Sequence, residues 1–174
     1  MSRLITILFG VGLLRPAPGT WGSLVAILLA WGINTYLGFP VMVAATIAVT
    51  LLAYWAISVE LADRPGADPG EIVIDEVAGQ WLAFLFPAAA FWGSGFEGWL
   101  PYPAPLAAFV LFRLFDIWKP WLVGRADRRG DAAGVLYDDL WAGLFAGLAS
   151  ILAAGIAHGI MFFGPMLTDW IMAL

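Results

Sequence analysis

Apolar residues fill long continuous stretches of this chain instead of alternating with polar ones. The main stretches are residues 21–37, 41–57, 77–93, 105–123 and 139–163. Runs of about 17 to 25 apolar residues are long enough to cross the hydrocarbon core of a bilayer as helices. Residues 4–14 are also apolar but too few to cross, so they predict a re-entrant or interfacial helix. The pattern predicts an all-α, polytopic membrane helix bundle with about four to five spans.

The composition supports a membrane protein and narrows its chemistry. Of the 174 residues, 62% are hydrophobic and 12% are charged, whereas soluble domains have roughly 45–50% apolar and 25% charged residues. The chain contains no cysteine, which excludes disulfides, thiol chemistry and cysteine zinc sites. It also has no basic tract that would bind nucleic acid. No internal repeat is visible, so residues 1–174 are interpreted as one domain, and nothing in them predicts an oligomeric state.

The positions of the charges predict an orientation. Residues 16–59 contain no charged residue. If successive apolar stretches cross in alternate directions and residues 4–14 do not cross, all basic residues lie at or near one face. These residues are Arg3, Arg15, Arg64, Arg113, Lys119, Arg125, Arg128 and Arg129. Short cytoplasmic loops are enriched in lysine and arginine, so this face is predicted to be cytoplasmic.

The same threading collects acidic residues at the cytoplasmic ends of the spans. They are Asp75, Glu76, Asp116, Asp138 and Asp139. A charge at the centre of a membrane helix costs roughly 2.5–3.5 kcal/mol on insertion scales, and such residues usually face the bundle interior and mark function. Carboxylates at one level repel one another unless a cation lies among them, and oxygen ligands suit Mg²⁺ or Ca²⁺. The acids therefore predict a metal site.

The segment "FRLFDIWKPW" spaces Arg113, Asp116 and Lys119 three residues apart. On a helix this spacing lets Asp116 face the bundle with a cation on either side. The interpretation we favour is a metal-binding or catalytic aspartate flanked by phosphate-binding cations. The alternative is an internal ion pair with a lysine that extends to the interface.

Two further segments allow a functional and a structural interpretation. In "GVLYDDLWAG", Asp138 and Asp139 are either site carboxylates or helix N-caps, and one of them could be only a cap. In "RPAPGTWGS", Arg15 and Thr20 stand where a helix N-terminus could bind phosphate. Capping of that helix by Thr20 explains the same letters without a ligand.

The loop "ADRPGADPGE" contributes Arg64, Asp68 and Glu71. Charged loops are usually only solvated. Beside Asp75 and Glu76, however, Arg64 could bind a phosphate, and Asp68 or Glu71 could support a metal ion.

Taken together, four motifs resemble the phosphatidylglycerophosphatase A family. They occur in the order "PAPGTWGS", "DPGEIVIDEVAGQW", "FRLFDIWKPW" and "GVLYDDLWAG", and they extend over most of the chain. The resemblance implies a multi-pass enzyme of the bacterial inner membrane whose active site faces the cytoplasm. It implies Mg²⁺-dependent hydrolysis of a phospholipid, phosphatidylglycerophosphate, to phosphatidylglycerol and inorganic phosphate, the reaction of a phosphoric monoester hydrolase.

The resemblance also assigns roles to residues. The family's acidic positions correspond to Asp68, Glu71, Asp75, Glu76, Asp116, Asp138 and Asp139, and its basic positions to Arg113 and Lys119. We expect Asp75, Glu76, Asp116 and Asp139 to bind the metal, with Asp68 and Glu71 as further candidate ligands. Asp138 and Lys119 complete the expected catalytic set, while Arg113, Lys119, Arg15, Arg64 and Thr20 are expected to bind the phosphate.

Other functions predict different patterns. A small ion- or proton-coupled transporter would use intramembrane carboxylates near the bilayer midplane, reachable from both sides. A CDP-alcohol phosphotransferase would need an Asp-Gly pair, Ala-Arg and two later aspartates at a spacing that "RADRRGDAAGVLYDD" does not provide. For the phosphatase, attack by metal-activated water is favoured, and a carboxylate nucleophile that forms an aspartyl phosphate is the alternative.

Overall fold

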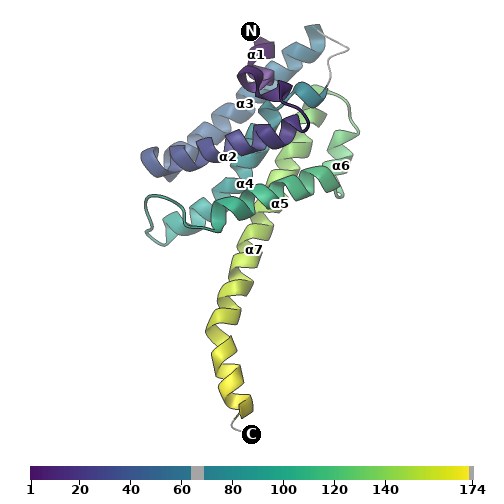
Figure 1. Cartoon of the computed structure of the whole chain (residues 1–174). Helices are drawn as coiled ribbons and strands as arrows, with labels where there is room; N and C mark the ends of the chain where they lie inside the picture. Colours follow the sequence, from purple (N-terminus) through teal and green to yellow (C-terminus); the bar gives the residue numbers. More distant parts are fainter. Residues whose placement is uncertain (64–68, 173–174) are drawn as a thin grey trace.

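The computed structural model describes residues 1–63 and 69–172, and side chains for 1–63 and 70–158. The described chain is helical, with no strand in those ranges. Its elements are α1 (Ser2–Thr6), the 3₁₀ helix η1 (Leu8–Leu13), α2 (Pro18–Leu37), α3 (Phe39–Asp63), the 3₁₀ helix η2 (Pro69–Glu71), α4 (Ile74–Gly93), α5 (Ala104–Trp118), α6 (Leu122–Asp127) and α7 (Ala132–Met172). The prediction of an all-α bundle is confirmed (Figure 1).

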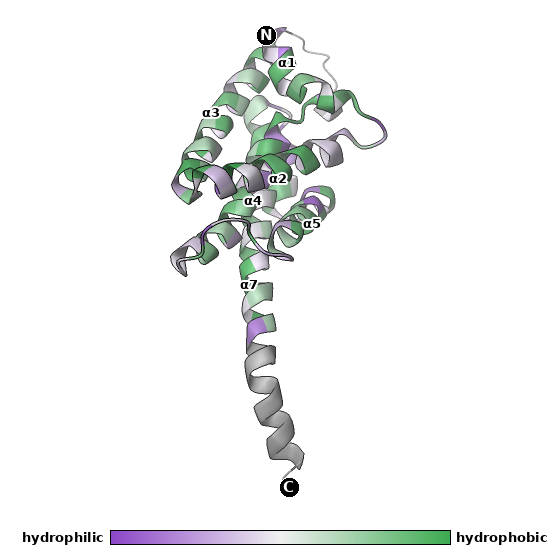
Figure 2. Ribbon diagram, turned by 60° about the vertical axis from the view of Figure 1, so that its left-hand side comes forward, coloured by the Kyte–Doolittle hydropathy of each residue, from purple (hydrophilic) through white to green (hydrophobic). Residues whose placement is uncertain are grey.

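Within the described residues, three helices have the length and composition needed to cross a membrane. They are α2, α3 and the Ala132–His158 part of α7. Hydrophobic residues predominate along α3 in Figure 2. Many of its large side chains are turned outward, with Ile47 and Leu51 exposed over more than half of their surface, while Met42 and Ile57 face the core. Neither α1 nor η1 is long enough to cross, in agreement with the prediction for residues 4–14.

Small and polar residues form the inward face of α2. The buried positions are Gly22, Ser23, Ala26, Ile27, Ala30 and Asn34, whereas Leu28 and Leu29 point outward. Small residues let helix backbones approach closely, which is the usual packing of membrane helices. The buried indole of Trp81 on α4 donates a 2.8 Å hydrogen bond to the carbonyl oxygen of Ala26. This face therefore holds α2 against α4.

Helix α4 is the centre of the bundle. It packs against α2, α3, α5 and α7, and most of its first turns are buried, from Ile74 to Trp81. The longest helix, α7, crosses α4 and then extends beyond the other helices (Figure 1). All side chains from Ile151 to His158 on this extension are exposed.

Two boundaries differ from the apolar stretches in the sequence. Helix α5 ends at Trp118, and Lys119 adopts a left-handed conformation with φ of 50°. Pro120 explains this end, because a proline disfavours a helical conformation in the residue before it.

Helix α7 begins at Ala132, seven residues before the apolar stretch that starts at 139. Asp131 caps it by accepting a 2.7 Å hydrogen bond from the N–H of Gly134. Capping is therefore the wrong interpretation of Asp138 and Asp139.

Candidate active site

The first turn of α4 buries two adjacent carboxylates. Asp75 is 5% exposed and Glu76 is 9% exposed. Negative side chains are favoured near a helix N-terminus because the free N–H groups and the helix dipole attract them. The backbone N–H of Glu76 donates a 3.0 Å hydrogen bond to Asp75 Oδ1. This bond fixes Asp75 against its own turn, while the Glu76 side chain points towards other helices.

Helix α2 provides the partners of Glu76. Ser23 Oγ lies 2.7 Å from Glu76 Oε2 and 2.8 Å from the carbonyl oxygen of Gly19. A Cβ atom at Gly19 would overlap the Glu76 carboxylate. Glycine at residue 19 therefore lets the α2 backbone approach the Glu76 carboxylate, and a larger residue would displace that side chain.

Arg113 on α5 joins two of the carboxylates. Its Nη1 lies 2.6 Å from Glu76 Oε2 and 2.9 Å from Asp116 Oδ2, and 3.3 Å from Ser23 Oγ. The side chain is only 15% exposed. A cation between buried acids offsets the repulsion and desolvation that two unpaired carboxylates would suffer.

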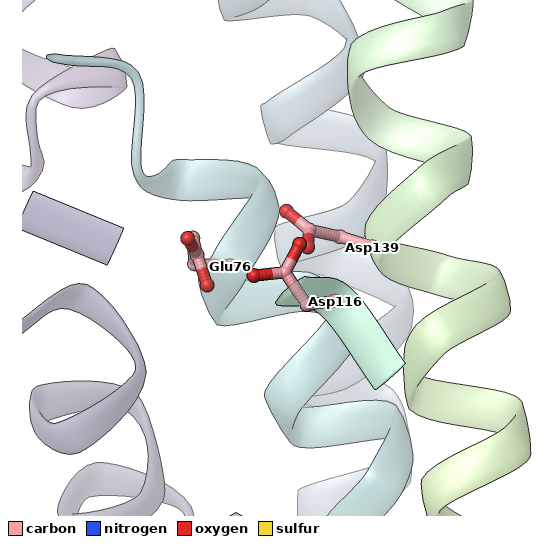
Figure 3. A group of neighbouring side chains, drawn as sticks. All are labelled: Glu76, Asp116 and Asp139. Carbon is pink, nitrogen blue, oxygen red and sulfur yellow. The ribbon is translucent and has the colours of Figure 1, made fainter. Parts of the chain in front are cut away.

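Three carboxylates from three helices converge beside Arg113. Glu76, Asp116 and Asp139 each offer an oxygen atom, and these atoms lie within 4.8 Å of one another. Figure 3 shows the side chains directed towards one another from α4, α5 and α7. Asp139 Oδ1 is buried and has no hydrogen-bond partner among the described residues. Such an atom is costly to bury alone, so the donor set fits a small divalent cation with a preference for oxygen ligands.

Lys119 forms ion pairs with two further aspartates that line the same cavity as the three converging carboxylates. Its Nζ forms ion pairs with Asp127 at the end of α6 and with Asp138 on α7, the latter at 3.0 Å. The left-handed turn at Lys119 lets the chain reverse into α6, and Gly124 packs against the Lys119 carbonyl oxygen. The turn therefore brings α6 and α7 together around one cation.

These groups line one cavity of about 370 Å³. Its walls include Asp75, Glu76, Arg113, Asp116, Lys119, Asp127, Asp138 and Asp139, together with the start of α2 at Ala17, Pro18 and Gly19. The volume is within the range of about 300–1,000 Å³ that is common for small-molecule sites. Two cations and several carboxylates in one cavity suit an anionic ligand that binds together with a metal ion.

Several residues expected at the site lie elsewhere. Arg15 is exposed and does not line the cavity, nor does Thr20. Glu71 pairs at 3.7 Å with Arg3 of α1 instead of facing the three carboxylates. Arg64 and Asp68 lie outside the described residues.

Two side chains of the site were not among the residues expected there. Ser23 belongs to the motif "PAPGTWGS", in which Thr20 was the residue expected to bind phosphate. Ser23 lies one helical turn after Gly19, and this spacing places both residues against Glu76. Asp127 stands among Arg125, Arg128 and Arg129 and was not singled out in the sequence. Nothing in its sequence surroundings indicates the pairing with Lys119.

These features define a helical protein of membrane type with a buried acidic site, lined by two cations, at one end of its bundle. Comparison with protein families identifies it further. The chain belongs to the phosphatidylglycerophosphatase A family, whose model matches residues 4–154. The resemblance recognised in the four motifs is thereby confirmed, and the family is one of phosphatases.

Individual relatives agree with this assignment. A phosphatidylglycerophosphatase A from Haemophilus influenzae is 34% identical over 141 residues, which cover 80% of each chain. The Escherichia coli protein of the same name is 31% identical over 81% of this chain and 76% of its own. A Bacteroides thetaiotaomicron relative with the provisional name phosphatidylinositol-3-phosphatase is 34% identical, over 78% of this chain and 82% of its own. No solved structure matches the chain.

Proposed function

We propose that this protein hydrolyses phosphatidylglycerophosphate to phosphatidylglycerol and inorganic phosphate. The observation that carries the proposal is the convergence of Glu76, Asp116 and Asp139 next to Arg113, in a cavity that Lys119 also lines. The family and the two relatives named phosphatidylglycerophosphatase A support this substrate. The reaction breaks the bond between phosphorus and the glycerol oxygen, consumes one water and leaves a free glycerol hydroxyl.

Mg²⁺ is the proposed cofactor, with Glu76, Asp116 and Asp139 as its ligands. The unpartnered Asp139 Oδ1 and the three converging carboxylates support this choice. Asp75 lines the same cavity and would support the site from its wall. When bound, Mg²⁺ supplies positive charge against the phosphate oxygens and makes water more acidic.

The cations of the chain have distinct proposed roles. Arg113 holds Glu76 and Asp116 in place, and its charge lies beside the proposed phosphate position. Lys119 also lines the cavity, where Asp138 and Asp127 position it. Fixed positive charges stabilise the phosphoryl oxygens in the transition state because they need no reorganisation as charge develops.

We place the site at the cytoplasmic face of the inner membrane. In this arrangement α4 and the shorter α5 add two crossings to α2, α3 and α7, which makes five. The 20 residues of α4 extend about 30 Å at 1.5 Å per residue, and the 15 residues of α5 about 22 Å. Arg3, Arg113 and Lys119 form ion pairs at the end of the bundle that holds the acidic cavity. The positive-inside rule assigns the end with these basic residues to the cytoplasm.

The test is phosphate release from phosphatidylglycerophosphate in detergent micelles, with and without Mg²⁺. We expect Mg²⁺-dependent release by the wild type and a loss of at least about 100-fold in Asp116→Asn, typical for removal of an electrostatic catalytic group. Asp131→Asn is the matched control, because Asp131 is exposed, lies outside the cavity and keeps a capping side chain after the change.

Other outcomes separate the alternatives. Preferential hydrolysis of phosphatidylinositol-3-phosphate would overturn the substrate but keep the phosphatase. Release that survives Asp116→Asn would remove this residue from the chemistry. No release by folded wild type, together with ion flux in liposomes, would favour a transporter instead. A phosphorylated protein trapped by acid quenching would replace water with a carboxylate as the attacking group.

A further inference from the structure

A second cavity of about 420 Å³ lies at the opposite end of α2 and α4 from the acidic site. It is formed by the last turn of α2, the start of α3, the end of α4 and the segment that leads to α5. In Figure 1 this region lies on the left, where α2 ends and the loop after α4 begins. None of its lining residues belongs to the acidic cavity, so it is a separate place in the fold.

Acceptor oxygens are prominent among the polar groups that line this cavity. Asn34 is only 8% exposed, and its Oδ1 has no partner among the described residues. The buried Oγ1 of Thr35 also lacks one there. Glu97 places a carboxylate in the lining, which contains no lysine or arginine. The buried oxygen of Asn34 would be costly without a donor, so the occupant should carry hydrogen-bond donors or positive charge.

Two helix ends add to the negative potential of the cavity. Helix α2 ends at Leu37 and α4 ends at Gly93, and residues of both last turns line the cavity. The C-terminal end of a helix carries a partial negative charge from its free carbonyl groups and favours cations. The start of α3 at Phe39 and Pro40 also lines the cavity and contributes the positive end of one helix dipole. Two helix C-termini and the carboxylate of Glu97 outweigh this one positive end, so the cavity favours a cation over an anion.

The aromatic lining distinguishes an organic cation from a metal ion. Tyr36, Phe39, Phe91, Trp92 and Phe96 all line the cavity. The rings of Phe39 and Trp92 stack with centroids 5.1 Å apart. Aromatic faces attract ammonium groups through their quadrupole, whereas Mg²⁺ and Ca²⁺ need about six or more oxygen ligands. One carboxylate and the three uncharged side-chain oxygens of Asn34, Thr35 and Tyr36 do not provide such a set.

We propose that this cavity binds an organic ammonium group. The group could belong to the headgroup of an amine-bearing phospholipid or to a free small amine, since both present the same chemistry to Asn34, Glu97 and the rings. The cavity volume is suitable for a small headgroup. This site is independent of the phosphatase reaction proposed above.

The test is a calorimetric titration of the detergent-purified full chain with choline and with ethanolamine. The sharpest control ligand is 3,3-dimethyl-1-butanol, which has the shape of choline without its charge. We expect saturable binding of the amines and binding of the neutral analogue that is at least about tenfold weaker, because charge–π and charge-assisted contacts are lost. Equal binding of choline and the neutral analogue would overturn the proposal.

Variants locate the site. Glu97→Gln changes an exposed side chain and should fold normally while it weakens amine binding about tenfold. Asn34→Leu should also weaken amine binding about tenfold. If the Asn34→Leu protein fails to fold, Thr35→Val is the second variant of α2 to test. Asp131→Asn, at the other end of the molecule, should bind as the wild type does. Unchanged binding in both Glu97→Gln and the folded α2 variant would overturn the proposal.

A second arm separates the two sources of the amine. The protein is placed in nanodiscs that contain phosphatidylethanolamine and phosphatidylglycerol in equal amounts, and retained lipids are identified by native mass spectrometry. Retention of phosphatidylethanolamine that is lost in Glu97→Gln identifies a lipid headgroup. Saturable binding of free amines without such retention identifies a soluble amine. Absence of both would exclude the ammonium site.

Discussion

Gly79 on α4 and Gly143 on α7 meet backbone to backbone, so that a Cβ atom on Gly143 would overlap the carbonyl oxygen of Gly79. A Cβ atom on Gly79 would in turn lie 2.5 Å from the carbonyl oxygen of Asp139. This contact is about one helical turn from both Glu76 and Asp139. It therefore sets the separation of two of the three converging carboxylates.

Gly143→Ala should disturb both stability and activity. The new methyl group meets backbone atoms that cannot rotate away, and overpacking of this kind costs typically about 1–3 kcal/mol. We expect a lower thermal unfolding temperature in detergent and a reduced rate of phosphate release. Gly155→Ala is the matched control on the same helix, because among the described residues its new Cβ would meet no atom of another helix within 4 Å. An unaltered Gly143→Ala protein would show that α4 and α7 can separate without cost.

Arg113→Gln should be far more damaging than Arg3→Gln. Removal of Arg113 leaves Glu76 and Asp116 without their shared cation, and breaking a buried pair costs about 3–5 kcal/mol. Arg3 is half exposed and pairs with Glu71 at 3.7 Å, and exposed pairs contribute about 0–1 kcal/mol. Chemical denaturation and phosphate release measure the two effects. Equal losses in the two variants would contradict the bridging role of Arg113.

Ser23→Ala should weaken the hold of α2 on Glu76. The variant loses the 2.7 Å hydrogen bond to Glu76 and the 3.3 Å contact with Arg113. A hydrogen bond to a charged group contributes about 1.5–3 kcal/mol, so we expect activity to fall at least about tenfold while the fold persists. Ser58→Ala is the control, because half-buried Ser58 donates its hydrogen bond to the Tyr54 carbonyl oxygen of its own helix, away from the candidate site. If Ser23→Ala retained full activity, Arg113 alone would be sufficient to position Glu76.

The cap of α7 should depend on pH. Arg129 and, second, the N–H of Gly134 lower the pKa of Asp131 from 3.8 to about 2. Because the folded pKa lies below the unfolded one, the ionised cap favours folding above about pH 4. This contribution is lost as the pH falls from about 4 to about 2.

Asp131→Ala tests this cap. The unfolding temperature of the variant should be below that of the wild type at pH 6, and the difference should shrink as the pH approaches 3. Hydrogen exchange at the first amides of α7 provides a local measurement. A difference that is constant from pH 6 to pH 3 would show that charge plays no part in the cap.

The long apolar helices were predictable because hydropathy is a local property. The stretches at residues 21–37 and 41–57 correspond to α2 and α3, within a few residues at the helix starts. The end of α5 was misplaced, because apolar residues continue past Pro120 although the helix does not. The start of α7 was placed too late, because Asp131 lies in a charged segment that does not reveal a cap.

The chemical character of the candidate site was also predictable, because buried charges are rare enough to indicate function wherever they occur. Glu76, Asp116, Asp139, Arg113 and Lys119 were all expected at the site and line its cavity. The ion pair of Glu71 with Arg3 was not predictable, since it depends on how α1 packs near the start of α4. The same holds for Asp127, which reaches Lys119 only because the chain reverses after α5.

The sequence by itself determined that the protein is helical, which segments are long and apolar enough to cross a membrane, and which residue types form the site. The tertiary structure decided that Glu76 and Asp139 join Asp116, while Asp75 bonds its own turn and Asp138 pairs with Lys119. Neighbouring helix residues point about 100° apart. Only the packing of α4, α5 and α7 determines which of two adjacent carboxylates faces the others.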